Sequence, residues 1–242
     1  MTQNLDLDLI SDPTAEGYVA LTPANTNITA DWTPANSTIA FTGNSVPGWK
    51  NSYTAPYSAD PGTLFIYSSG STSDDEQYTT LSECQQHHSD CNMHNHAGNY
   101  YNWTAAIASN NSSSITKRYS TVPDSICPAG WRLPKGHASS TYSVANWEFT
   151  NLLYTSDITN STEENPSYTT DGLNNIRISP IYLVRSGGIF NGYIGYGNSG
   201  SYWSSTTDSA NYIYGLRFDR SSVSPSGSED RDRGVSVRCV AK

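Results

Sequence analysis

One stretch of the chain gathers side chains that could bind a metal ion. Its cysteines and histidines are Cys84, His87, His88, Cys91, His94 and His96. Thiolate and imidazole are the usual ligands of zinc, and four of these six side chains could complete a tetrahedral site. The C-x6-C spacing of the two cysteines, however, matches no standard zinc pattern, and no second cysteine pair lies nearby. The spacing therefore favours a disulfide loop with solvent-exposed histidines, and we expect no metal site here.

The chain contains 4 cysteines, an even number that predicts disulfides in a Lys-poor chain rich in Ser, Thr and Asn. Four cysteines allow three pairings, and we expect Cys84–Cys91 and Cys127–Cys239. The first pair would close a small ring within a loop. The second would close a loop of roughly 110 residues and stabilise the folded state by about 4 kcal/mol. Four reduced thiols are the alternative, whereas disulfides would indicate an oxidising compartment.

Familiar catalytic motifs are absent from the sequence. It has no phosphate loop, no G-x-S-x-G nucleophile elbow and no dinucleotide fingerprint. The glycine-rich run 187–197 does not lead from a strand into a helix, so it predicts a tightly turned loop. Carboxylate pairs such as Asp74–Asp75 and Glu163–Glu164 lie in polar runs that are typical of solvated surface. We expect no cofactor; a structural calcium ion is the alternative, with ligands that the sequence does not place.

Alternation of apolar and polar side chains marks the C-terminal part of the chain. The apolar positions Tyr214, Leu216 and Phe218 alternate with Gly215, Arg217 and Asp219. This period of two is that of a strand, so we expect the apolar set to face the core and Arg217 and Asp219 to face solvent. Polar residues also recur at every second position further on: Ser224, Ser226, Ser228, Asp230 and Asp232.

The outward positions of this C-terminal part carry mostly Tyr, Ser, Asn, Asp, Arg and Gly. Antibody paratopes use the same residue types, because Tyr supplies rigid contact area while Ser, Gly and Asn supply adaptable hydrogen bonds. The pattern therefore indicates a binding surface. The alternative is a β-surface that is merely soluble, with Arg217–Asp219 and Arg231–Asp232 as weak surface ion pairs. Residue chemistry alone favours neither.

The charge and hydropathy of the chain exclude some classes of protein. Lys and Arg number 13 against 22 Asp and Glu, which gives a net charge of −9. This argues against a nucleic-acid-binding protein, whose affinity comes mainly from a basic face that neutralises phosphates. No apolar run approaches the ~20 residues that span a bilayer, so we expect no membrane insertion.

The first ten residues, MTQNLDLDLI, lack the basic and apolar regions of a signal peptide. Their sequence predicts either a cytoplasmic protein or a piece of a longer exported chain. The Ser/Thr/Asn-rich composition favours the piece of an exported chain.

Local patterns predict a loop-rich α+β domain. Short apolar runs between Pro, Gly, Asn and Ser indicate short strands and long turns in residues 1–80. The clearest helix is expected from Val144 to about Tyr154. Residues 99–108 are typical of a short helix or a buried strand, and two prolines in 125–134 predict an irregular, tightly turned segment. From Ile176 onward the pattern again indicates strands.

Several segments, in this order, resemble one family over nearly the whole chain. They are MTQNL, C-x6-C followed by NYYNWTAA, SICPAGWRLP, a helix containing Trp147, the SGG…YWSST run and the terminal GVSVRCV. The chain resembles the Fibrobacter succinogenes major paralogous domain, a branch of the C-type lectin-like fold. CPAGWRLP followed at this distance by SVRCV is the most specific part. The chain departs from the family at its start, where the strand and the Trp that usually precede the first motif are missing.

The resemblance implies a C-type lectin-like core, with fold class α+β. Such a core is loop-rich, has a small twisted antiparallel sheet and one or two helices, and brings its N- and C-terminal strands together. We expect one domain over residues 1–242, with the core motifs in 100–242 and N-terminal strands and loops in 1–99.

The resemblance also implies a source of variation. Some proteins with this domain are variable proteins of diversity-generating retroelements, whose C-terminal segment is mutagenised at adenines to diversify a binding surface. The affected codons readily yield Asn, Tyr, Ser, Asp, Arg and Gly, but not Lys, Gln, Met, Trp or Glu. Between Tyr196 and Arg233 the chain has no Lys, Gln or Met, and the exceptions are Trp203 and Glu229. Trp203 belongs to the YWSST scaffold motif, whereas Glu229 implies a fixed position or a segment that is not diversified.

On this basis the C-terminal residues divide into scaffold and ligand-contact positions. The scaffold positions are Tyr214, Leu216, Phe218, Val223, Pro225, Gly234 and Cys239. The ligand-contact positions are Asn198, Tyr202, Asp208, Asn211, Tyr212, Arg217, Asp219, Ser224, Ser226, Ser228, Asp230, Asp232 and Arg233.

We therefore expect a non-enzymatic, monomeric binding module, outside the cell or at its surface, for a protein or glycan ligand on another cell or particle. One alternative is a structural or adhesive surface domain whose last segment does not vary. Another is an oxidase like the formylglycine-generating enzymes, which share the broad fold. The enzyme is disfavoured because its chemistry uses a pair of active-site cysteines, and the C-terminal region offers only Cys239.

Overall fold

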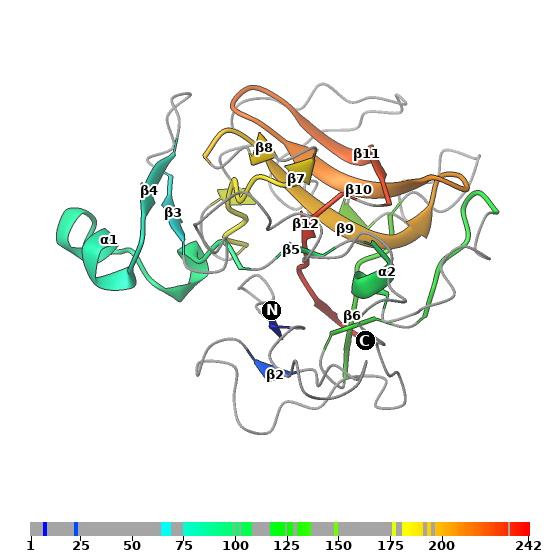
Figure 1. Ribbon diagram of the computed structural model, residues 1–242, viewed down its shortest axis with the longest axis horizontal. Coiled ribbons are helices and arrows are strands. Elements are labelled where there is room, and N and C mark those ends of the chain that lie inside the picture. The colour runs from blue at the N-terminus through cyan, green and yellow to red at the C-terminus, as the bar shows by residue number, and fades with distance from the viewer. Residues whose placement is uncertain are drawn as a thin grey trace.

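The protein is a sheet-rich α+β structure in the computed structural model (Figure 1). The structure describes residues 7–8, 22–23, 64–68, 75–98, 100–101, 103–107, 117–123, 125–127, 130–136, 148–149, 176–177, 181–190, 193–194, 197–231 and 233–242. Of the helix predicted from Val144 to Tyr154, all but residues 148–149 lies outside this part of the chain, and so does Trp147.

The largest sheet has five strands in the order β11-β10-β9-β12-β5. The strands are β5 (Tyr100–Tyr101), β9 (Gly200–Thr207), β10 (Tyr212–Phe218), β11 (Val223–Asp230) and β12 (Val235–Ser236). Three of the strand pairs are antiparallel, but β12 runs parallel to β9. The sheet is therefore mixed rather than the antiparallel sheet that we expected.

Small two-stranded pairs surround this sheet. They join β1 (Leu7–Asp8) to β2 (Thr22–Pro23), β3 (Phe65–Tyr67) to β4 (Glu76–Tyr78), β6 (Trp131–Arg132) to β13 (Val240–Ala241), and β7 (Ile189–Phe190) to β8 (Tyr193–Ile194). The short strands expected in residues 1–80 are thus found where the structure describes that region. The antiparallel β7–β8 pair lies within the glycine-rich run, whereas the residues between its two strands, where the tight turn was predicted, lie outside the described residues.

The helices differ in part from the prediction. Helix α1 (Leu81–His87) forms in the stretch around Cys84 that we expected to be a loop. Thr80 caps it by accepting a hydrogen bond from the backbone N–H of Glu83 at 3.1 Å, and Glu83 in turn accepts from Thr79. This T-x-x-E sequence is typical of a helix N-terminus, so the sequence contains a signal for the start of α1.

Two further helical segments are short. The 3-10 helix η3 (Met93–Asn95) follows the second cysteine of the C-x6-C motif. Helix α2 (Trp103–Ala106) comes directly after β5, so the stretch 99–108 holds both of the elements that its sequence allowed. Among the residues that the structure describes, no helix is long and apolar enough to cross a membrane.

The strands predicted from Ile176 onward form only in part. Residues 181–188 run as an irregular segment whose one β-bridge joins Gly187 to Gly200. Leu183 and Val184 in this segment are nevertheless buried, so its apolar residues serve the core without strand pairing.

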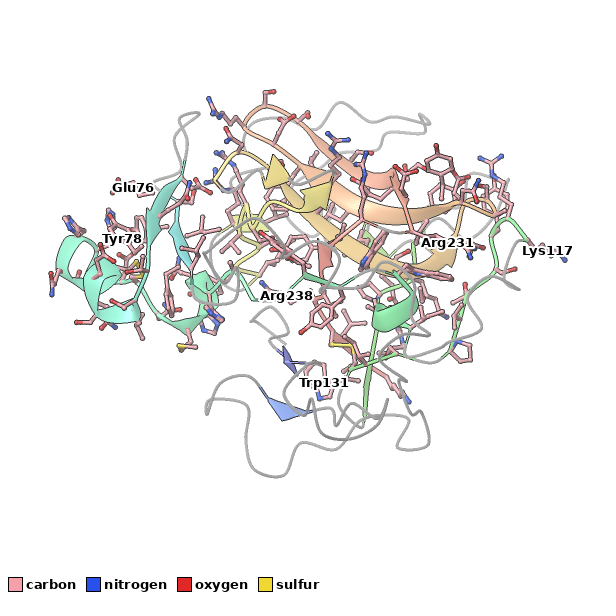
Figure 2. All side chains as sticks on the ribbon, viewed as in Figure 1. Glu76, Tyr78, Lys117, Trp131, Arg231 and Arg238 are labelled. Carbon is pink, nitrogen blue, oxygen red and sulfur yellow. A yellow bond between two sulfur atoms is a disulfide. The ribbon has the colours of Figure 1, made fainter. Side chains whose placement is uncertain are left out.

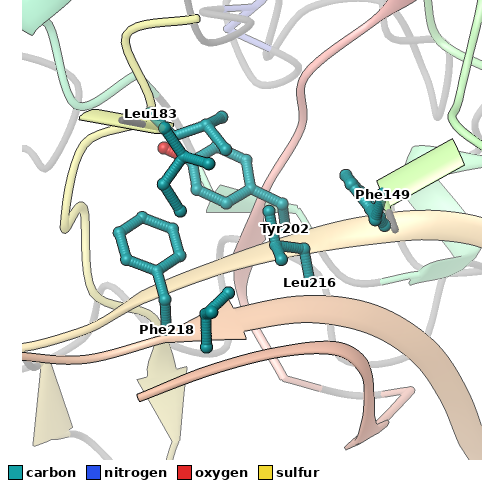
Figure 3. Packing of buried hydrophobic residues seen from close by; sticks show 7 residues of the cluster. Phe149, Leu183, Tyr202, Leu216 and Phe218 are labelled. Carbon is teal, nitrogen blue, oxygen red and sulfur yellow. The ribbon is translucent and has the colours of Figure 1, made fainter. Parts of the chain in front are cut away.

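The main apolar cluster packs against one face of the sheet at the Phe218 end of β10 (Figure 3). Its members are Phe149, Ile176, Leu183, Tyr202, Leu216, Phe218 and Val223. Gly200 allows the Phe218 ring to approach, because a Cβ there would lie 2.5 Å from that ring. Trp103 and Trp203 are also fully buried. Their indole N–H groups donate to backbone carbonyls at 3.0 and 2.7 Å, so neither buried N–H lacks a hydrogen-bond acceptor.

Both predicted disulfides are present. Cys84 is bonded to Cys91, and Cys127 to Cys239, which lies 112 residues further along the chain. The second bond joins Cys127 to Cys239, the residue directly before β13, close to where β13 pairs with β6. Because all four sulfurs are used in disulfides, none of them is a thiolate ligand for zinc.

Candidate ligand-binding surface

The pairing of β10 with β11 distributes the predicted contact residues over two faces of the sheet. Tyr212 lies opposite Asp230, and Arg217 lies opposite Ser224. Directly opposed residues share a face, and successive residues of one strand alternate between faces. Tyr212 and Arg217 are five positions apart, so their pairs lie on opposite faces.

A β-bulge in β11 changes the face of the sheet on which some of the predicted contact serines lie. Gly215 lies opposite Gly227, but Arg217, two residues on, lies opposite Ser224, three residues back along β11. The extra residue in β11 shifts its alternation. Ser224 therefore shares a face with Arg217, whereas Ser228 lies opposite Tyr214 on the other face. The simple period of two, which predicts these serines on one face, is wrong at this point.

Burial changes sides along β10. At its start Tyr212 is exposed and Ile213 is buried; towards its end Leu216 and Phe218 are buried and Arg217 is exposed. The sheet thus packs on the core through one face at one end and through the other face at the other end. The predicted division into inward Leu216 and Phe218 and outward Arg217 is confirmed.

We name two groups of surface residues after this division. The Tyr212 patch consists of Arg118, Asp208, Asn211, Tyr212, Ser228, Asp230 and Arg233. The Arg217 patch, at the end that carries the β10–β11 turn, consists of Asn198, Arg217, Asp219, Arg220 and Ser224. Ser226 is half-buried beside the bulge and belongs to neither.

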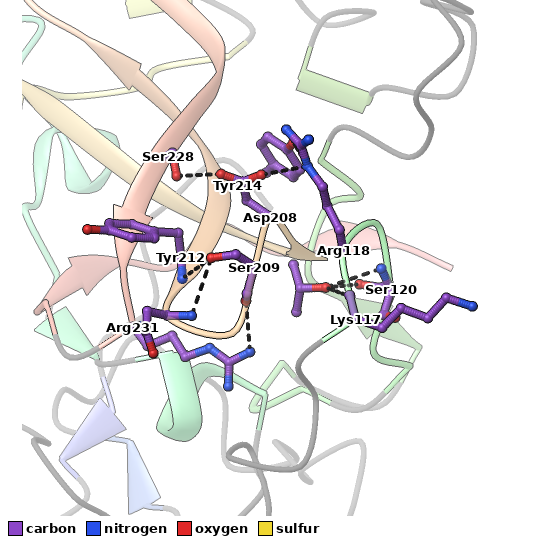
Figure 4. A network of polar contacts seen from close by, with 11 residues as sticks. Lys117, Arg118, Ser120, Asp208, Ser209, Tyr212, Tyr214, Ser228 and Arg231 are labelled. Atoms are coloured by element: carbon purple, nitrogen blue, oxygen red, sulfur yellow. Dashed lines mark hydrogen bonds and ion pairs between the residues drawn. The ribbon is translucent and has the colours of Figure 1, made fainter.

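Asp208 organises the Tyr212 patch (Figure 4). Its Oδ1 accepts from Arg118 Nε at 3.0 Å, and its Oδ2 accepts from the hydroxyl of Ser228 at 2.9 Å. Arg118 Nη2 also donates to the phenol oxygen of Tyr214 at 3.0 Å. These bonds join the loop at residues 117–120 to both strands of the hairpin, so they fix a polar frame at the surface.

The electrostatics of this frame follow from its partial burial. Burial raises the pKa of Tyr214 well above its usual range, and the hydrogen bond with Asp208 raises it further, so the phenol stays protonated. The hydrogen bond with Tyr214 and the charge of Asp208 raise the pKa of Arg118. The frame therefore keeps the Arg118 guanidinium charged and the Tyr214 phenol neutral.

Tyr119 supports the frame from its own strained conformation. Its φ of 61° lies in the left-handed region that non-glycine residues rarely adopt. There its backbone N–H donates to the carbonyl of Thr207 at 2.7 Å, and its ring stacks on that of Tyr214 with centroids 5.9 Å apart. The Arg118 guanidinium lies 4.8 Å from the centre of the Tyr119 ring.

Glu229 belongs to the scaffold although its neighbours are accessible. Its side chain is only 2% exposed, and it accepts hydrogen bonds from Arg233 and, at 3.3 Å, from Ser201. Arg233 also lies 3.4 Å from Asp230. A buried carboxylate needs such partners, and these contacts fix the Glu229 side chain in the scaffold. Arg233 is accordingly tied to the scaffold as well as being part of the Tyr212 patch.

The alternative of a merely soluble surface included an ion pair between Arg231 and Asp232. The Arg231 guanidinium lies 4.8 Å from the centre of the Trp103 ring and donates to the carbonyl of Ser209 at 3.3 Å. Asp232 lies outside the residues that the structure describes.

Asp219 builds the turn of the Arg217 patch. Its Oδ1 accepts from the backbone N–H groups of Ser221 and Ser222, both at 2.8 Å. Burial opposes ionisation of Asp219, but these amide hydrogen bonds outweigh burial and lower its pKa. The alternative of a merely soluble surface placed Asp219 in an ion pair with Arg217; the carboxylate instead accepts hydrogen bonds within its own turn. Arg220 in the same turn donates to Asn198.

Tyr202 was predicted to contact ligand, and this prediction is wrong. Its side chain is 0% exposed and packs in the main apolar cluster. Its hydroxyl donates to the carbonyl of Val184 at 2.8 Å and accepts from the N–H of the same residue at 3.1 Å. The reason is that Tyr202 lies opposite Leu216 and so shares its inward face.

Arg118 and Tyr119 were not among the residues predicted from the sequence. They lie about ninety residues before the hairpin that they contact, in a polar run with no motif. Only the tertiary fold brings them to the Tyr212 patch.

The histidine-rich stretch forms aromatic and hydrogen-bonded contacts. His88 Nε2 lies 3.0 Å from the phenol oxygen of Tyr78 and 3.2 Å from Glu76, and the ring of His94 stacks on that of Tyr182. In the part of the chain that the structure describes, no three His, Cys, Asp or Glu side chains are grouped so that they could hold a metal ion.

Comparisons of the chain with protein-family models, curated proteins and solved structures match none of them.

Proposed function

We propose that this protein is a non-enzymatic binding module that recognises a protein or glycan ligand through the Tyr212 patch. The observation that carries the proposal is the exposure of Tyr212. At 44% it is the one large hydrophobic side chain that is exposed among the described residues. A tyrosine in a frame of serine, aspartate and arginine is the chemistry of a paratope, where the ring gives contact area and the polar groups give direction.

The structure also suits a surface that changes its side chains while the scaffold stays fixed. Leu216, Phe218 and Val223 fill the core, whereas Asn211, Tyr212 and Ser228 are exposed on the same hairpin. Glu229, one of the two exceptions to the adenine-derived residue set, is a buried scaffold residue. These features support the further proposal of a C-type lectin-like variable protein of a diversity-generating retroelement.

The disulfides support a location outside the cell or at its surface. All four bonded cysteines are buried, and disulfides form and persist mainly in oxidising compartments. The same bonds weigh against an oxidase like the formylglycine-generating enzymes, because Cys239 is bonded to Cys127 and only 1% exposed. We propose that the module acts as a monomer, with its ligand on another cell or particle.

Comparison of this locus across sibling strains tests the proposal. We expect amino-acid differences at Asn211, Tyr212 and Ser228, with Ile213 and Glu229 unchanged. A neighbouring reverse transcriptase and a near-copy of the final segment should accompany them. Differences scattered over scaffold and surface alike, or none at all, would favour the structural or adhesive domain instead.

A display library tests the same division in the laboratory. The positions Asn211, Tyr212, Ser228 and Asp230 are randomised among Asn, Tyr, Ser, Asp, Arg and Gly, and the matched control library randomises Ile213, Leu216, Phe218 and Glu229 in the same way. The surface library should remain mostly folded, as judged by protease resistance, and should yield binders to an unrelated purified protein. The control library should be largely unfolded. Equal folding of the two libraries would contradict the proposal.

A further inference from the structure

A cavity of about 340 Å³ lies beside the β6–β13 pair. Its lining includes Trp131, Phe149, Leu183 and Val240, which give it apolar walls. Cavities of roughly 300 Å³ and more with mostly apolar walls are typical of small-molecule sites. Figure 2 labels Trp131, which lies below the main sheet in that view.

The cavity extends from the surface to the core. Ala241 at its edge is exposed, and Trp131 and Val240 are half-buried. Phe149 and Leu183, at its other side, belong to the main apolar cluster. A ligand that enters beside β13 therefore reaches side chains of the core.

The walls of the cavity are held in place by the fold. The pairing of Trp131 with Ala241 joins two parts of the lining. The Cys127–Cys239 disulfide adds a covalent bond at Cys239, another lining residue. The cavity is therefore formed before any ligand arrives.

The two charged side chains among the described lining residues make their polar contacts within the protein. Arg132 donates to both carboxylate oxygens of Glu148. Arg238 donates to the carbonyls of Ile181 at 3.2 Å and Tyr182 at 2.7 Å. Both charged groups are thus satisfied by the protein itself, so the cavity does not depend on a ligand to pair either of them.

Backbone groups of the lining are paired as well. The carbonyl of Pro134 accepts from the N–H of Ser205 at 2.8 Å, and the N–H of Leu183 donates to the carbonyl of Ile176 at 2.8 Å. A water molecule in a cavity needs two to four polar partners, which such walls supply poorly. Displacement of poorly held water by an apolar group increases affinity.

We propose that this cavity binds a neutral, apolar small molecule of two or three rings. The volume sets the size, because a cavity of about 150 Å³ binds benzene and this one has somewhat more than twice that volume. The walls set the polarity, since they favour burial of apolar surface and would leave a charged group without its hydration. The lining shares no residue with the Tyr212 or Arg217 patch, so the proposal does not rest on the proposed function.

Fluorescence titration with a matched pair of dyes tests this site. Phenylnaphthylamine is neutral and apolar, and anilinonaphthalene sulfonate has the same rings with an added sulfonate. The native protein should bind the neutral dye saturably, with one-to-one stoichiometry, and about tenfold or more tightly than the sulfonate. Equal or tighter binding of the sulfonate would overturn the neutral character of the site. Absence of saturable binding of the neutral dye would overturn the site itself.

Two tryptophan variants locate the binding. Ala241→Trp, at an exposed position of the lining, should block the cavity and weaken the neutral dye by about tenfold or more. Lys242→Trp is the matched control, because it adds the same side chain at the next exposed position, outside the lining. It should bind the dye as the native protein does. Each variant is first shown to be folded by near-ultraviolet circular dichroism.

The outcomes separate the cavity from general dye binding. If Ala241→Trp binds the neutral dye as the native protein does, or if Lys242→Trp weakens it equally, the dye binds elsewhere and the proposal is wrong. If Ala241→Trp does not fold, the smaller Ala241→Leu replaces it, and unchanged affinity in that variant also overturns the proposal. Tyr212→Ala should bind the dye like the native protein; a loss there would place the dye on the Tyr212 patch instead.

Discussion

Tyr202 and Tyr212 lie in neighbouring strands and differ only in what surrounds them. Tyr202 is enclosed by the apolar cluster and its hydroxyl is bonded to the backbone of Val184, whereas Tyr212 is exposed. Residue type allows both roles, since a tyrosine has an apolar ring and a polar tip. The position in the strand pairing decides between core and contact surface.

Alanine at these two tyrosines should have opposite consequences. Tyr202→Ala removes a fully buried ring, so we expect it to lower the free energy of unfolding by about 3–5 kcal/mol. Tyr212→Ala should change it by no more than about 0.5 kcal/mol, because its ring is at the surface. Urea denaturation of both variants measures the difference. Similar losses would mean that Tyr212 is a core residue.

Asp219 gives the turn of the hairpin a dependence on pH. Its pKa is lowered in the folded protein, so its stabilisation is fully present above the ordinary pKa of an aspartate. It is lost as the pH falls below that ordinary pKa and through the lower, folded value. Asp219→Asn should therefore flatten the acid side of a plot of unfolding free energy against pH. Superimposable slopes for the two proteins would show that the turn draws no stability from the carboxylate charge.

At the scale of elements, the sequence predicted strand character well and strand register poorly. Alternation along β10 follows from Tyr214, Leu216 and Phe218, because a strand that packs on a core must alternate. The bulge in β11 leaves no such signal, since it depends on the partner strand. Thr80 and Glu83 encode the start of helix α1. The close spacing of Cys84 and Cys91 nevertheless led us to predict a loop in this stretch.

The candidate site was likewise predictable only in part. Exposure of Arg217 followed from local pattern, but the frame around Asp208 required Arg118 from a distant loop. Spatial proximity across ninety or so residues is a property of the fold and has no counterpart in local spacing.

The two disulfides should differ in their effect on the stability of the elements that they join. Replacing Cys127 and Cys239 by alanine opens the longer loop and should cost about 4 kcal/mol, whereas replacing Cys84 and Cys91 should cost about 2 kcal/mol. Urea denaturation of the two double variants against the native protein gives both values. The reverse order would show that the small ring at helix α1, rather than the clamp at β13, holds the fold.

At the scale of the whole molecule, a buried ionic cluster connects segments that are far apart in the sequence. Asp75, at the start of β4, pairs with Arg177 and lies 3.5 Å from Arg185, and all three side chains are at most 2% exposed. The backbone of Asp75 is bonded to Gly197 just before β9. The β3–β4 region is thereby anchored to the approach to the main sheet.

Removal of the central carboxylate should loosen this connection. Asp75→Ala leaves two guanidinium groups buried beside each other, so we expect a loss of about 3–5 kcal/mol in the free energy of unfolding. Asp90→Ala, which removes an exposed carboxylate from the same region, is the matched control and should cost much less. Equal costs, measured by urea denaturation, would mean that the cluster does not anchor the β3–β4 region.

The change of sides along β10 limits how this protein can evolve. Opposite faces of β10 pack on the core at its two ends, so the register of the strand is constrained along its whole length. Inserting a single residue before Ile213 would move every later side chain of the strand to the other face. Leu216 would then face solvent, and Arg217 would face the apolar core. We therefore expect the hairpin to tolerate substitutions at its exposed positions but not insertions or deletions within β10.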